Sequence, residues 1–151
     1  MQTPDSHAVE TVLHGLLSVG RMFRQGGAQD SLDPGTFWLL KTMASSGPLR
    51  VTEVASSVNL DPSTVSRHLS QMERSGLIDR TPDPADGRAQ LVAVSAEGRQ
   101  QLEAAFARRR ELLARSLADW DPHDLAEFER LLNKFARAIE SSTPKKEEPQ
   151  P

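Results

Sequence analysis

The chain has 151 residues, of which 26% are charged and 37% apolar, and its formal net charge is −3. This composition indicates a soluble globular protein that buries roughly two-thirds of its unfolded surface, and no apolar run approaches the roughly 18 residues of a membrane span. The absence of cysteine excludes disulfides, thiolate zinc sites and thiol redox sensing. The first residues lack the basic start and apolar stretch of a secretory signal, so we expect a cytoplasmic protein.

The first half of the chain alternates short apolar segments with turn residues, which predicts helices joined by tight turns. The elements expected there are a helix over residues 7–25, a helix that begins at Asp33-Pro34 and ends at Ser46, an extended piece over 49–51, and a helix over 53–58 with Thr52 as its N-cap.

The next segment predicts a helix over residues 62–75, since Val65, Leu69 and Met72 recur at helical spacing after an Asp61-Pro62 start. The short turn between this helix and the one before it gives the spacing of a helix-turn-helix. The remaining elements expected are strands near 77–80 and 91–94 around a turn over 82–88, a helix capped by Ser95 that runs to Trp120, a helix from Asp121-Pro122 to about Ile139, and a disordered tail over 141–151.

Opposite its apolar seam, the 62–75 helix carries hydroxyls, amides and arginines, which are the groups that hydrogen-bond base edges and phosphates. This pattern predicts a DNA-reading surface, and a solvated polar face is the alternative. The predicted contacts on this helix and at the cap before it are Thr52, Ser63, Thr64, Ser66, Arg67, His68, Ser70, Gln71 and Arg74.

The turn between the two predicted strands contains Asp86-Gly87-Arg88, which predicts a hairpin wing with Arg88 at its tip. An arginine there suits the narrow minor groove of A·T-rich DNA, and we expect Asp86 to cap the turn and hold the guanidinium. The alternative is a surface turn with an unpaired arginine.

The charge balance between residues 48 and 99 counts against a nucleic-acid partner, because six arginines there face seven acids. The DNA-binding interpretation therefore requires the arginines to gather on one surface while the acids cap helices or point away.

From about residue 34 to 140 the chain resembles the MarR family of winged-helix transcription regulators. The resemblance is sharpest over residues 65–80, 83–88 and 94–99, where Asp86 and Arg88 match the Asp-x-Arg pattern of that family's wing. It implies a mainly α fold with a small β wing, in which a winged helix-turn-helix is flanked by dimerisation helices. The implied organisation is an N-terminal dimerisation helix over 1–33, the DNA-binding region over 34–99, C-terminal dimerisation helices over 100–140 and the tail over 141–151.

The last predicted helix carries an apolar heptad seam, which predicts pairing with a second copy, with packing inside one chain as the alternative. The seam consists of Leu125, Phe128, Leu132, Phe135 and Ile139. A two-fold dimer places its two recognition helices about 34 Å apart, one turn of DNA.

In the resembled family, small ligands bind between the dimer helices and the winged helix. This implies an aromatic or lipophilic effector here, although core packing is the alternative for each candidate residue. The candidates are His14, Met22, Phe23, Arg24, Phe37, Trp38 and Met43. We expect no metal site, because the four histidines are scattered along the chain, and we also expect no cofactor.

The expected function is that of a homodimeric regulator, usually a repressor in the resembled family, that binds a pseudopalindromic operator in double-stranded DNA and is released by a ligand. Motifs for phosphate loops, nucleophile elbows and zinc proteases are absent from the sequence, so we do not expect an enzyme. The alternative is a winged-helix dimer that binds proteins and no DNA; steeply salt-dependent duplex binding distinguishes the two.

Overall fold

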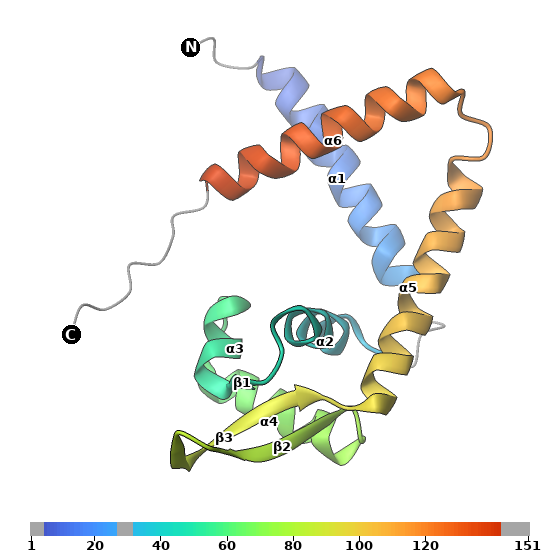
Figure 1. Cartoon of the computed structure of the whole chain (residues 1–151). Helices are drawn as coiled ribbons and strands as arrows, with labels where there is room; N and C mark the ends of the chain where they lie inside the picture. Colours follow the sequence, from blue (N-terminus) through green and yellow to red (C-terminus); the bar gives the residue numbers. More distant parts are fainter. Residues whose placement is uncertain (1–4, 27–31, 143–151) are drawn as a thin grey trace. The chain divides into compact units, whose positions relative to one another are not determined.

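The computed structural model describes residues 5–26 and 32–142, with the side chains of residues 22–26 left out of the description. The chain divides into two compact units, Met1–Leu112 and Leu113–Pro151. The elements are α1 (Ser6–Gly26), α2 (Pro34–Ser46), β1 (Leu49–Arg50), α3 (Val51–Ser57), α4 (Pro62–Arg74), β2 (Ile78–Asp83), β3 (Asp86–Val94), α5 (Ala96–Ser116) and α6 (Pro122–Ser142) (Figure 1).

The three strands form one antiparallel sheet in the order β1-β3-β2. Leu49 lies opposite Val92, and Ile78 lies opposite Val94. The hairpin of β2 and β3 extends away from the point where α5 begins (Figure 1). Helices that surround a small hairpin-bearing sheet confirm the predicted fold class, a winged helix-turn-helix within a mainly α chain.

The core of the first unit lies where α2, α3 and α4 pack on each other and on the sheet. Leu40, Val54 and Val92 are fully buried there. Val65 and Leu69, which belong to the predicted seam of α4, are equally buried. Burial of this seam fixes which side of α4 is turned to solvent, because each helical residue keeps its angle relative to its neighbours.

The predicted N-caps of α2 and α4 are confirmed. Asp33 accepts hydrogen bonds from the backbone of Gly35 and Thr36, and Asp61 accepts one from Thr64. The prediction for α3 was wrong, because the helix begins at Val51 and its N-cap is Arg50, not Thr52.

Arg50 can occupy this position because its backbone N–H donates to Glu53 Oε2 at 2.6 Å. A glutamate in the first turn that reaches back to the N-cap backbone satisfies a donor at the helix start. A side-chain acceptor at residue 52 is therefore not needed to begin the helix.

A close junction joins the end of α4, the start of β2 and the start of α5. Gly76 has a φ of +74°, a left-handed conformation that glycine adopts without strain, and it ends α4. The Ser95 hydroxyl donates to the Gly76 carbonyl at 2.6 Å and accepts from the Gly98 N–H at 2.9 Å, which confirms the predicted cap of α5. A Cβ on Gly98 would lie 2.1 Å from the Leu77 carbonyl oxygen, so only glycine fits where α5 crosses this turn.

The C-terminal boundaries differ from the predictions. α5 ends at Ser116, before the predicted Trp120, where the backbone changes to a turn bond from Trp120 N–H to the Leu117 carbonyl. α6 continues to Ser142, beyond the predicted end near Ile139. Residues 143–151, which belong to the predicted tail, lie outside the described residues.

Replacing Asp33 by alanine is expected to lower the free energy of unfolding by about 1 kcal/mol, the usual cost of losing a helix N-cap. Burial raises the pKa of the Asp33 carboxyl, but hydrogen bonds from Thr36 and Gly35 outweigh that effect and leave the pKa below its ordinary value. Because the folded-state pKa is depressed, the contribution of the cap is present above the ordinary carboxyl pKa and is lost as pH falls through the folded value.

Urea denaturation at neutral and acidic pH measures this difference. The Asp33→Asn variant is the matched control, since asparagine also caps helices. A gap between wild type and Asp33→Ala that stays constant into acid would contradict the expected role of the ionised carboxylate.

Candidate nucleic-acid interface

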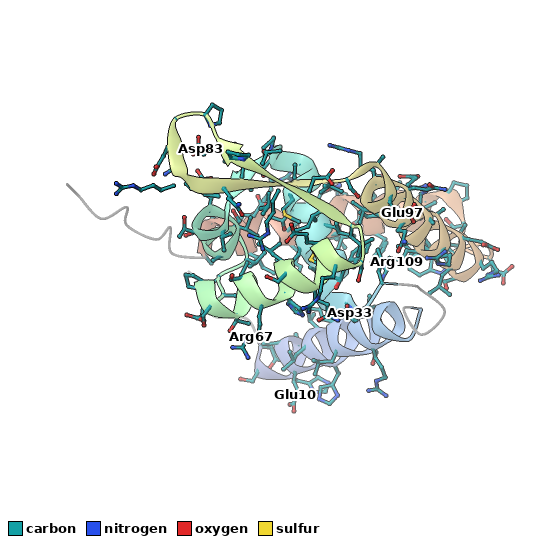
Figure 2. The ribbon with its side chains drawn as sticks, turned by 90° about the horizontal axis from the view of Figure 1, so that it is seen from below. Glu10, Asp33, Arg67, Asp83, Glu97 and Arg109 are labelled. Atoms are coloured by element: carbon teal, nitrogen blue, oxygen red, sulfur yellow. The ribbon has the colours of Figure 1, made fainter. Side chains whose placement is uncertain are left out.

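α4 presents a polar face to solvent, because its apolar seam is buried against the core. Figure 2 shows α4 on the face turned toward the viewer, with Arg67 on it and the hairpin that carries Asp83 above it in the view. A shallow groove of about 360 Å³ follows this face. Its lining residues are Thr64, Arg67, His68, Gln71 and Arg74.

These five residues all belong to the predicted DNA-contact set, so the structure brings them together on one side of α4. Ser63 is exposed at the start of the helix, and Thr52 is exposed in the first turn of α3. Within the described residues, the guanidinium groups of Arg67 and Arg74 form no hydrogen bond or ion pair. Both charges are therefore available to a ligand.

The N-terminal turn of α4 is organised by the Asp61 carboxylate. The hydroxyls of Ser63 and Thr64 both donate to Asp61 Oδ2, and so does the Thr64 N–H at 3.0 Å. These bonds, that of Ser63 first, hold the pKa of the Asp61 carboxyl below its ordinary value. Because their protons point to Asp61, the two hydroxyl oxygens offer lone pairs outward and suit donors such as the exocyclic amines of adenine or cytosine.

Ser70, which was expected on the outward face of α4, is half-buried, and so is Ser66 on the flank of that face. The Ser70 hydroxyl donates to the Ser66 carbonyl at 2.9 Å and accepts from Arg80 Nη2 at 3.4 Å. Arg80 belongs to β2, so the wing covers this side of α4. Helical periodicity alone could not reveal that cover.

His68 lies at the edge of the groove and is half-buried against the first turn of α2. A Cβ on Gly35 would lie 3.1 Å from His68 Cε1, so the ring fits against the bare backbone of a glycine. His68 Nδ1 is buried and has no hydrogen-bond partner among the described residues. Its position indicates packing between α4 and α2 at the border of the polar face.

The predicted geometry of the wing tip was wrong. The turn consists of Pro84 and Ala85, and Asp86 is already the first residue of β3. Asp83 lies opposite Asp86, whereas the preceding Pro82 lies opposite Gln90. Residues 87–89 therefore form a bulge, which bends the strand and can redirect its side chains.

Arg88 lies in this bulge, exposed and beside the tip instead of on it. Asp86 accepts a hydrogen bond from the Arg88 backbone N–H at 3.1 Å. Among the described residues, the Asp86 carboxylate forms no bond with the Arg88 guanidinium, so that expectation was also wrong.

Sequence reasoning missed two arginines that hold the wing. Arg50 donates through Nε to Asp83 Oδ2 at 2.8 Å, and the Asp83 carboxylate is only 8% exposed. The pKa of Asp83 is lowered, first by the Ala85 N–H and then by Arg50. Arg80 donates through Nε to Glu73 Oε2 at 2.8 Å. These partners are 33 and 7 residues apart, so no local spacing indicated them.

Most of the seven acids between residues 48 and 99 accept hydrogen bonds from nearby groups, which reduces the weight of the unfavourable charge count. The acids that do so are Glu53, Asp61, Glu73, Asp83 and Asp86. Arg67, Arg74 and Arg88 are exposed and form no ion pair with a described residue. Arg67 and Arg74 thus lie together along one face of α4, which meets part of what a nucleic-acid surface requires despite the overall negative charge.

A second concave site of about 530 Å³ lies in the first unit, against α2 and α5. It is lined by Gly20, Pro34, Phe37, Trp38, Lys41, Phe106 and Arg109. The Arg109 guanidinium lies 3.9 Å from the Phe37 ring centroid, and the Lys41 ammonium lies 5.3 Å from that of Trp38.

The effector candidates are divided by this geometry. Phe37 and Trp38 line the cavity, whereas Met43 is buried in the core and His14 is exposed on α1 outside the lining. The side chains of Met22, Phe23 and Arg24 lie outside the described residues. Lys41, Phe106 and Arg109 were not predicted; the recurrence of aromatic and basic residues on two helices was the available signal.

Over residues 5–26 and 32–142, none of the helices combines the length and apolar character needed to cross a bilayer. In the same ranges, no three histidine, aspartate or glutamate side chains gather as a metal site would require.

Comparison with known proteins gives consistent matches. A model of the MarR family matches residues 32–89. The chain is 35% identical over 109 residues to YxaD of Bacillus subtilis (strain 168), an uncharacterized HTH-type transcriptional regulator, and the match covers 72% of this chain and 76% of the relative. It is 26% identical to MdtR of the same organism, an HTH-type transcriptional repressor, over 75% of this chain and 73% of that protein.

Solved structures have the same fold. A MarR family protein from Bacillus stearothermophilus superposes with a TM-score of 0.81 at 23% identity, covering 92% of this chain and 98% of the other. Wild-type MarR from E. coli, in its apo form, superposes with a TM-score of 0.70 at 18% identity, covering 89% and 98%.

Proposed function

This chain belongs to the MarR family, and on that premise we propose that it is a transcriptional regulator that binds double-stranded DNA. In this proposal α4 enters the major groove and the β2–β3 wing reaches the adjacent minor groove, the usual docking of a recognition helix and a basic extension.

The observation that carries the proposal is the distribution of charge on the winged helix. Arg67 and Arg74 on α4 and Arg88 on the wing are exposed and have no ionic partner among the described residues. Arginine side chains bind guanine edges and phosphates in protein–DNA complexes, and these three are available to do so. The other exposed residues of the predicted set are proposed to contact the DNA backbone or to read bases around these three, namely Thr52, Ser63, Thr64, Gln71 and Asp86.

We propose a homodimer, supported by the exposed apolar face of α6. The seam residues of α6 remain between 37% and 50% exposed, and no residue of α6 is buried. Valines and leucines of α1 are exposed to a similar degree. Apolar surface of this extent is typical of a protein interface, so residues 1–33 and 100–140 are proposed to supply the dimerisation helices.

Release by a small effector is the proposed regulation, with the α2–α5 cavity as its site. Phe37, Trp38 and Phe106 offer aromatic surface, while Lys41 and Arg109 bring positive charge, which suits an aromatic or lipophilic acid. Such a ligand acts by binding more tightly to the dimer whose wing spacing does not match the operator, which makes the protein a ligand-released repressor.

Selection of bound fragments from random duplex DNA, followed by affinity measurements over a salt series, tests the proposal. We expect a pseudopalindromic sequence with half-sites one helical turn apart, and an affinity that falls steeply as salt releases the phosphate contacts. A folded dimer that binds no duplex at any salt concentration would instead support the protein-interaction alternative.

A further inference from the structure

The side chain of Arg80 links the wing to α4 through hydrogen bonds. Its Nε donates to Glu73 Oε2 at 2.8 Å, and its Nη2 donates to Ser70 Oγ at 3.4 Å. Ser70 is itself tied to the backbone of α4 through the Ser66 carbonyl. Arg80 of β2 therefore contacts two residues of α4, Ser70 and Glu73, that lie about one helical turn apart on the same side of the helix.

Arg80 differs from the arginines proposed to contact DNA. Its side chain is only 17% exposed, and its donors are directed at α4. Glu73 is 44% exposed, so the ion pair adds little to the free energy of unfolding because water screens it. The consequence of the contact is geometric, since a planar guanidinium that holds two acceptors fixes direction as well as distance.

The other end of β2 is held in a similar way. Asp83, its last residue, binds Arg50 at the start of α3 and lies where the bulge around Arg88 begins. The strand is thus fastened to α4 through Arg80 and to the α3 side through Asp83. Along the chain, Arg80 and Asp83 both lie between the helix proposed to read the major groove and the arginine proposed to enter the minor groove.

We propose that Arg80 is a positioning residue that sets the wing relative to α4 and thereby determines how strongly the sequence flanking the operator contributes to binding. The inference rests on the proposed function and extends it to a specificity determinant that contacts no DNA. Loss of Arg80 keeps the Arg88 side chain but lets the wing that carries it shift. The minor-groove preference therefore weakens, while base reading by α4 remains.

The experiment compares two duplexes with the same selected half-sites and either A·T-rich or G·C-rich sequence where the wing reaches. The readout is the ratio of the two affinities. A change of protein charge that weakens binding to both duplexes equally leaves this ratio unchanged. Arg88→Ala sets the scale by bringing the ratio close to unity. We expect Arg80→Gln to move the ratio at least halfway to that value, Arg80→Lys to retain more of the wild-type ratio, and the Arg80→Gln/Arg88→Ala double variant to match Arg88→Ala.

Arg130→Gln is the matched control, because it removes an arginine from the Glu127 ion pair on α6. Glu73→Gln weakens the same contact from the other side, keeps Arg80 and should lower the ratio in the same direction. A wild-type ratio in Arg80→Gln, or an equal loss of affinity for both duplexes, overturns the inference while the proposed function stands. Failure of the wild-type protein to bind either duplex overturns both.

Discussion

Alanine in place of Arg67 is expected to weaken binding to a selected operator by roughly 1–3 kcal/mol per half-site, one of the two largest effects we expect. Arg67 is exposed in the groove along α4 and has no partner among the described residues, so its guanidinium is available to DNA. If it reads a guanine, the variant also loses discrimination at that base pair; if it binds phosphate, all sequences weaken alike and the salt dependence becomes shallower.

Fluorescence anisotropy with the selected duplex and single-base variants measures both quantities. Arg130→Ala is the matched control, since it removes an arginine from α6, whose ion pair is with Glu127. Wild-type affinity and discrimination in Arg67→Ala would mean that α4 does not read DNA through this face.

Aspartate in place of Leu132 is expected to abolish dimerisation and to lower operator affinity by about 10²- to 10⁴-fold. Leu132 lies in the middle of the exposed seam of α6, where a second copy would bury it. An unpaired carboxylate is strongly disfavoured in an apolar interface. The affinity falls because two linked recognition helices gain an effective concentration that a single subunit lacks.

Analytical ultracentrifugation measures the oligomeric state, and fluorescence anisotropy measures the operator affinity of the same samples. Asn133→Asp introduces the same carboxylate one residue along, on the polar side of α6, and should leave both properties unchanged. A Leu132→Asp protein that stays dimeric, or one that is monomeric with undiminished operator affinity, would contradict the proposed role of the seam.

Most of the fold was predictable because the sequence carries local signals for it. The caps at Asp33 and Asp61 precede prolines, and the apolar spacing of α4 continues for two turns, so helix starts and the buried side were correctly placed. The start of α3 was misplaced because Glu53 accepts a hydrogen bond from the Arg50 N–H, which takes the place of the expected Thr52 cap. Residue spacing alone does not show whether a helix begins with such a bond or with a side-chain cap.

The polar face of α4 was only partly predictable for a different reason. Periodicity separates the buried side from the rest, but it cannot indicate which exposed positions a neighbouring strand will cover. Arg80 covers Ser70, and Arg50 binds Asp83, through contacts that depend on how the hairpin folds over the helices. The bulge also moved Arg88 off the tip, because strand register is set by pairing across the hairpin.

The junction around Gly98 has a mechanical consequence for any regulator built in this way. Ser95 and Gly98 fasten the first turn of α5 to the residues between α4 and β2, with no space for that turn to slide. The winged helix and the start of α5 are thus firmly joined at this point. The chain passes from its first compact unit to its second farther along α5, after Leu112. In the proposed dimer, a ligand that moves one winged helix away from the other must therefore bend or tilt α5 itself and cannot separate the start of α5 from the winged helix.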